Sequence, residues 1–188
     1  AGATPAAGSP NGHNGGHMET SAAHVQVSNI ARITTAAAQG LTGNWLIDPQ
    51  DFTVGGGALD NISGATLSAQ LVTNSVTINT ATGPNVTVAG TPPLTTLNTA
   101  TAGNGDIHIN EAVSWTASSS PTTLTLNAVR DINVNKPVSA TNANFVACCG
   151  RAVTGNPPIP TVNGRVLLGP GRKVSVLAAR PTTDGNTI

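Results

Sequence analysis

The sequence predicts an all-β fold, a parallel β-solenoid with coils of about 20 residues. Three consecutive stretches, residues 123–143, 144–164 and 165–185, fall into one repeat of 21 residues. Within each repeat, apolar residues alternate with polar ones, as they do along a strand with one buried face. Each repeat also ends on Asn or Asp followed by a small residue, which is typical of a turn. These observations indicate short strands stacked on equivalent strands of the next repeat.

The apolar positions of the three repeats coincide. The columns that result are Leu124–Phe145–Val166, Leu126–Ala147–Leu168 and Ile132–Val153–Val174. The pattern extends upstream with looser spacing, because residues 106–110 resemble residues 131–135 and residues 75–79 form the same unit again. We therefore expect insertions to lie in turns and the strands to keep their apolar face. In particular, Val134 should be buried and Thr125 should lie on the polar face.

The composition favours strands over helices. Charged residues make up 9% of the chain and aromatic residues 2%, and no window of ten or more residues has a clear helical period, so we expect essentially no α-helix. The large side chains that could fill a core are Trp45, Phe52, Trp115 and Phe145. We divide the chain into a Gly/His-rich segment, residues 1–20, which is a separate segment or a first irregular coil, and a solenoid over residues 21–188.

The charge balance argues against several kinds of partner. The formal net charge is zero and there is no basic patch, so nucleic acid and anionic membranes are not expected as partners. No apolar run approaches 18 residues, so membrane insertion is not expected either. The first 16 residues lack the apolar core of a signal peptide, and the last three look like the start of another strand. We expect a segment of a longer protein or one subunit of a stack.

Four runs of the sequence resemble the shaft of filamentous-haemagglutinin-like exoproteins. They are GGHMETS at 15–21, LTGNWLIDPQDFTV at 41–54, GDIHINEAVSW at 105–115 and LTLNAVRDINVN at 124–135. The resemblance extends from about residue 15 to residue 185. Two features depart from the family: the chain has no Asn-Pro-Asn-Gly type motif of the secretion domain, and residues 151–160 contain Pro157 and Pro158, which cannot donate to a strand ladder.

The resemblance implies a right-handed parallel β-helix with an adhesive or scaffolding role. Members of the family are secreted by Gram-negative bacteria and stay extracellular or attached to the cell surface. The resemblance implies that the parent protein is exported by an outer-membrane two-partner-secretion transporter. It also implies a glycan or a receptor on a host or neighbouring cell as a partner, without naming the ligand.

An arginine column is the strongest candidate for a binding site. Arg130, Arg151 and Arg172 occupy one position of the three repeats. Three stacked guanidinium groups could bind a sulfated or acidic glycan, or they could form a solvated ladder at a corner of the fold. We favour the ladder, and Asp131 beside Arg130 fits it.

Two cysteines and two sequons are further candidates for modification. Cys148 and Cys149 are adjacent, so a strand would point their side chains to opposite faces. A disulfide or a crosslink between subunits is one interpretation, and a buried thiol beside a free one is the interpretation that we slightly favour. Asn61 and Asn85 each begin an N-glycosylation sequon.

Catalytic and metal sites are not predicted. His13, His17 and His24 lie in a segment that is not helical, so their spacing does not align them as metal ligands. Asp48 and Asp51 flank a turn and are better explained as a turn residue and a strand cap than as paired carboxylates. With eight acidic residues and no catalytic motif, we expect no enzyme activity and no cofactor.

The sequence therefore predicts a structural or adhesive shaft segment of a secreted bacterial surface exoprotein. The alternative is a subunit that associates with itself end to end through strand edges to form an extracellular filament. Binding of a polysaccharide or of ice is a more remote alternative. Ice binding would need Thr pairs in one column, but the 21-residue repeat places Asn144 and Val146 below Thr123 and Thr125.

Overall fold

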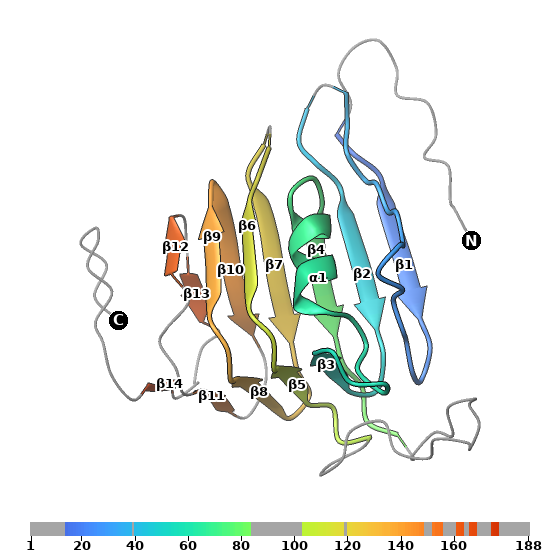
Figure 1. Ribbon diagram of the computed structural model, residues 1–188, viewed down its shortest axis with the longest axis vertical. Helices are drawn as coiled ribbons and strands as arrows, with labels where there is room; N and C mark the ends of the chain where they lie inside the picture. Colours follow the sequence, from blue (N-terminus) through green and yellow to red (C-terminus); the bar gives the residue numbers. More distant parts are fainter. Residues whose placement is uncertain are drawn as a thin grey trace.

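The computed structural model describes residues 14–38, 40–83, 103–118 and 120–148 in full, and the backbone of four short strands beyond them. The described strands are parallel to their neighbours and form three sheets (Figure 1). A single α-helix accompanies them in this part of the chain. The three sheets share one apolar interior.

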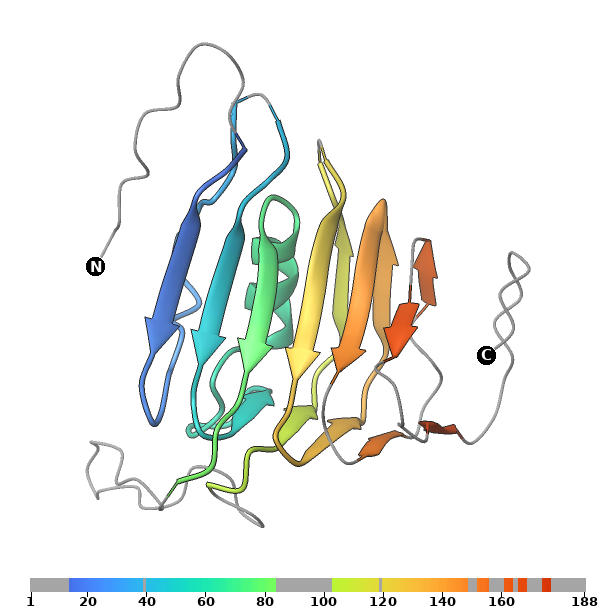
Figure 2. The same ribbon diagram turned by 180° about the vertical axis from the view of Figure 1, so that it is seen from behind.

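The largest sheet contains six strands in the order β1-β2-β4-β7-β10-β13 (Figure 2). Their bounds are β1 His17–Ser21, β2 Asn44–Asp48, β4 Ser75–Asn79, β7 Thr122–Asn127, β10 Ala143–Cys148 and β13 Val166–Leu168. The register pairs Leu124 with Phe145, and Phe145 with Val166. This pairing confirms the column that the 21-residue repeat predicted, because strands with the same alternation place their apolar faces together.

The two smaller sheets complete the arrangement. One has the order β14-β11-β8-β5-β3, and the other has the order β12-β9-β6. The bounds in the first are β3 Phe52–Val54, β5 Ile107–Ile109, β8 Asp131–Val134, β11 Ala152–Gly155 and β14 Val174–Val176. Those in the second are β6 Val113–Thr116, β9 Val138–Thr141 and β12 Thr161–Asn163.

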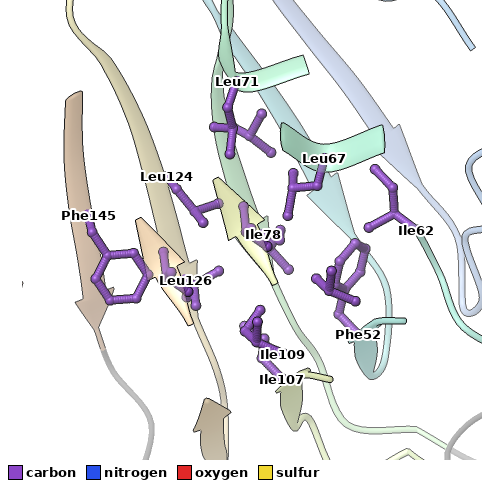
Figure 3. Close-up of a cluster of buried hydrophobic side chains, with 14 of the residues drawn as sticks. Phe52, Ile62, Leu67, Leu71, Ile78, Ile107, Ile109, Leu124, Leu126 and Phe145 are labelled. Carbon is purple, nitrogen blue, oxygen red and sulfur yellow. The ribbon is translucent and has the colours of Figure 1, made fainter. Parts of the chain in front are cut away.

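Inward side chains from all three sheets form one hydrophobic core. Figure 3 shows the part of this core that the two larger sheets and α1 contribute. Trp45, Phe52, Trp115 and Phe145, the four bulky residues expected there, are at most 4% exposed. Val134 is buried as predicted, and Thr125 lies on the outer, half-buried face of β7. The alternation of apolar and polar residues thus decides which face of each strand is buried.

Helix α1, Gly64–Leu71, lies beside β6 at the end of the three-stranded sheet (Figure 1). Ser63 caps it by accepting a hydrogen bond from the Thr66 N–H at 3.1 Å. The Ser68 hydroxyl accepts a hydrogen bond from the Ser114 N–H of β6, so the helix satisfies part of that strand's edge. Gly64 permits this contact, since a Cβ there would lie 2.3 Å from the Ala112 carbonyl oxygen.

The predicted fold class, an all-β right-handed parallel β-helix with coils of about 20 residues, is wrong. The described residues form three open parallel sheets and a helix, rather than a regular solenoid or a closed sheet. Paired residues of the largest sheet lie 27, 31 and 48 positions apart in the N-terminal half, and 21 apart only beyond β7. The physical reason is that the intervening segments are long enough to contain a helix and an irregular strap.

Two buried asparagines hold that strap, residues 22–36, against the sheets. The Asn74 side chain, which is fully buried, accepts hydrogen bonds from the N–H and hydroxyl of Thr35 and donates to the Ile33 carbonyl. The Asn61 amide donates to the Val25 carbonyl at 2.6 Å and accepts from the Thr53 N–H at 2.7 Å. Both amides replace ladder hydrogen bonds where the strap has no regular strand.

Candidate functional site

Three aspartates lie in one column where the strands of the five-stranded sheet begin. Asp51 and Asp106 directly precede β3 and β5, and Asp131 is the first residue of β8. The register pairs Phe52 with Ile107 and Ile107 with Ile132, so the three aspartates lie on successive strands at the same corner. We call Asp51, Asp106, Asp131, Arg130 and His108 the charged corner.

Asp51 is a buried acceptor of backbone hydrogen bonds. It is 3% exposed, and its carboxylate accepts hydrogen bonds from the N–H groups of Gly103, Gly105 and Asp106. The bonds from Gly105 and Asp106 both measure 2.8 Å. Three amide donors offset much of the cost of burying the charge and hold the chain just before β5 in place. The strand-capping role predicted for Asp51 is therefore what the structure contains.

Asp106 forms the ion pair of the corner. Its carboxylate is 1% exposed and accepts two hydrogen bonds from the Arg130 guanidinium, from Nε at 2.6 Å and from Nη2. It also accepts a hydrogen bond from the Asp131 N–H at 3.2 Å. The Asp131 carboxylate lies 3.6 Å from Arg130 Nε. The hydrogen bond with Asp106 raises the pKa of Arg130 above its ordinary value, so the arginine stays charged.

His108 lies on the outer side of β5 between Thr53 and Asn133 in the register. Its Nε2 is 4.0 Å from an Asp106 carboxylate oxygen and has no hydrogen-bond partner among the described residues. Burial lowers the pKa of His108, and the neighbouring Asp106 opposes this only in part. The imidazole is therefore neutral near pH 7 and adds no charge to the corner.

The geometry of the charged corner is better explained as a set of interactions that hold neighbouring strands together than as a ligand-binding site. The two buried carboxylates accept hydrogen bonds from four backbone amides and a guanidinium, and the Arg130 side chain is 26% exposed. The solvated ladder of three arginines that we favoured from the sequence stays a prediction. Arg151 and Arg172 lie outside the described residues.

Sequence reasoning missed that Asp51 and Asp106 meet. They are 55 positions apart, and the sequence pattern relates Asp51 only to its neighbour Asp48. A signal was present, because the run Asp51-Phe52-Thr53-Val54 has the same Asp-apolar-polar-apolar pattern as residues 106–109 and 131–134. Comparing short strand units, rather than long repeats, would have aligned all three.

The modification candidates have different environments. Cys148 is disulfide-bonded, and Cys149 is the only other cysteine of the chain, although its position lies outside the described residues. This corrects the slight preference for a free thiol. Asn61 is 3% exposed and its amide nitrogen donates to Val25, so a glycan on it would have to displace a buried hydrogen bond. Asn85 lies outside the described residues.

The histidines considered as metal ligands do not gather in the described part of the chain. There, no three His, Cys, Asp or Glu side chains are placed to hold a metal ion. His17 lies exposed on β1, and burial lowers the pKa of His24 in the strap. His13 lies outside the described residues. In the same ranges, no helix has the length and apolar character that crossing a membrane requires.

Comparisons with protein-family models, curated proteins and solved structures found no match to this chain.

Proposed function

We propose that this chain is a structural and adhesive segment of a secreted surface exoprotein of a Gram-negative bacterium, with no catalytic role. The structural part of the proposal rests on the charged corner, whose two buried carboxylates are hydrogen-bonded to other groups of the fold. Asp51 and Asp106 are used to fix successive strands, rather than being held apart in an open cleft as acid and base would be. The secreted, adhesive part rests on the sequence resemblance to exoprotein shafts.

The outer face of the largest sheet supports a scaffolding role. Outward residues of neighbouring strands bond to one another, as the Thr77 hydroxyl does to the Asn44 amide oxygen at 3.1 Å and the Asn144 amide to the Thr123 hydroxyl at 3.3 Å. These contacts tie outward side chains of neighbouring strands together and so support a rigid surface for display outside a cell. The register pairs Thr125 of β7 with Val146 of β10, so the Thr column that ice binding would need is interrupted on this face.

Surface labelling tests the proposal. Antibodies raised against the purified chain should label intact cells of the source bacterium, and a soluble excess of the chain should reduce attachment of those cells to a glycan-coated or cell-coated surface. Labelling that appears only after the cells are permeabilised would contradict the surface location. Labelling without any effect on attachment would leave a scaffold and remove the adhesive role.

A second candidate function is that of a filament subunit assembled end to end. It is favoured by strand β1, which is the first strand in the order of the largest sheet and pairs only with β2 among the described strands. An open strand edge is a template for pairing with another chain.

A further inference from the structure

On the side away from β2, strand β1 pairs with none of the strands that the structure describes. In a parallel pair, alternate residues bond to the same neighbour. The Gly16 carbonyl accepts from the Asn44 N–H at 3.1 Å, and the Ala22 N–H donates to the Asp48 carbonyl at 3.3 Å, so the even-numbered residues face β2. The backbone groups of His17, Glu19 and Ser21 therefore point to the open side. This edge offers three N–H and three C=O groups to another strand.

The interior behind β1 is incompletely covered. Met18 and Thr20 are the inward residues of β1, and both are only partly buried. Their partners on β2, Trp45 and Ile47, are 1% and 0% exposed. Leu41 lies next to the start of β1, because its carbonyl accepts a hydrogen bond from the Gly15 N–H, and Leu41 is 61% exposed. A strand added to β1 would bury Met18 as β1 buries Trp45.

The other end of the same sheet has the matching pattern. The last strand, β13, pairs only with β10 among the described strands. Following the backbone register across the sheet gives two continuous rows of paired residues, Met18–Trp45–Val76–Leu124–Phe145–Val166 and Glu19–Leu46–Thr77–Thr125–Val146–Leu167. Placing β13 of one copy beside β1 of the next would continue both rows without a break in direction or register.

We propose that β13 of one copy of this chain adds as a parallel strand to β1 of the next. The contact joins two different edges and continues the sheet in one direction, so successive copies would build an open filament. The zero net charge of the chain provides little repulsion between copies. This inference rests on the second candidate function, and it names the two strands that meet.

Engineered disulfides in the full chain test the register. The proposed contact makes Glu19 and Leu167 register partners, so Glu19→Cys and Leu167→Cys would bring the two Cα atoms within about 4.4–6.8 Å, the range that a disulfide requires. Mild oxidation should then yield a ladder of dimers, trimers and larger species on a non-reducing gel. The matched control, Glu19→Cys with Leu168→Cys, shifts one cysteine by a single strand position, where side chains alternate between faces, and should yield none.

The outcomes separate the alternatives. Dimers from Glu19→Cys alone would show that β1 pairs with β1 of another copy, and an absence of any ladder from the first pair would overturn the contact. Light scattering provides an independent measurement: Glu19→Pro removes an outward N–H and should abolish multimers, whereas Glu19→Ala, which keeps that N–H, should retain them. Equal scattering by both variants would contradict the proposal. Neither result affects the surface-labelling test, so failure of this contact is distinguishable from failure of the adhesive role.

Discussion

Replacing Asp51 with alanine should be among the most damaging single changes at the charged corner. Asp51 is buried and accepts backbone hydrogen bonds from Gly103, Gly105 and Asp106. A hydrogen bond to a charged group contributes about 1.5–3 kcal/mol. The three bonds share one acceptor, and water can enter after truncation, so the loss should be smaller than the sum of three separate bonds. We expect Asp51→Ala to lower the free energy of unfolding by about 4–6 kcal/mol.

Asp51→Asn provides an intermediate case. The remaining amide oxygen can still accept from Gly105 and Asp106, but the amide nitrogen faces a donor at Gly103. We expect a cost of about 2–3 kcal/mol, because one bond is lost and the others no longer involve a charge.

Urea unfolding followed by circular dichroism measures these differences. Asp48→Ala is the matched control, since Asp48 lies in the same turn at the end of β2 and is only partly buried. It should change the free energy of unfolding by less than about 1 kcal/mol. Equal effects of Asp51→Ala and Asp48→Ala would refute the claim that the backbone bonds of Asp51 hold the corner.

Val134→Asp should lower the free energy of unfolding by more than about 3 kcal/mol through an unpaired buried charge, while Thr125→Ser should cost under about 1 kcal/mol. Similar melting shifts for the two variants would mean that the strand faces are assigned wrongly. Because burial lowers the pKa of folded His108, the unfolded chain takes up the proton first, so stability should be full above about pH 6.5 and fall as the pH drops below it. His108→Asn should reduce this fall, measured as the difference in unfolding free energy between pH 7.5 and pH 5, and an unchanged difference would contradict the burial of a neutral imidazole.

The strand columns could be predicted because they depend on a local pattern. Alternation of apolar and polar residues determines which face of a strand is buried, and a constant 21-residue spacing determines which residues pair. Leu124, Phe145 and Val166 pair as the repeat indicated. Where spacing is irregular, the same rule identifies a strand such as β4 but not its neighbour, since Val76 pairs with Leu124 across 48 positions.

Helix α1 was missed because it is short. Eight residues fall below the window in which a helical period is recognisable, and three of them are Gly, Thr or Ser, which are not strong helix formers. Its local signals were nevertheless present: Ser63 at the cap, and Leu67 and Leu71 four residues apart on the buried side. The helix is stabilised mainly by packing of that side against the core, and tertiary contacts of this kind are not visible in a short window of sequence.

The charged corner could be predicted only in part. The place of Arg130 just before β8 followed from the repeat, and the proximity of Asp131 followed from adjacency in sequence. The partner that decides the chemistry, Asp106, belongs to the previous strand unit and reaches Arg130 across the register. Its burial, and the occupation of Asp51 by backbone amides, depend on how the loops enter the sheet.

A double-mutant cycle between Asp106 and Arg130 tests most directly whether the ion pair of the charged corner stabilises the fold. The cycle compares Asp106→Asn, Arg130→Gln and the double variant with the unmodified chain in urea unfolding. The bidentate contact and the burial of Asp106 predict a coupling energy of about 1–2 kcal/mol, reduced from that of a buried pair because Arg130 is 26% exposed. A coupling energy below about 0.3 kcal/mol would contradict the account and would leave the guanidinium energetically free to bind an external anion.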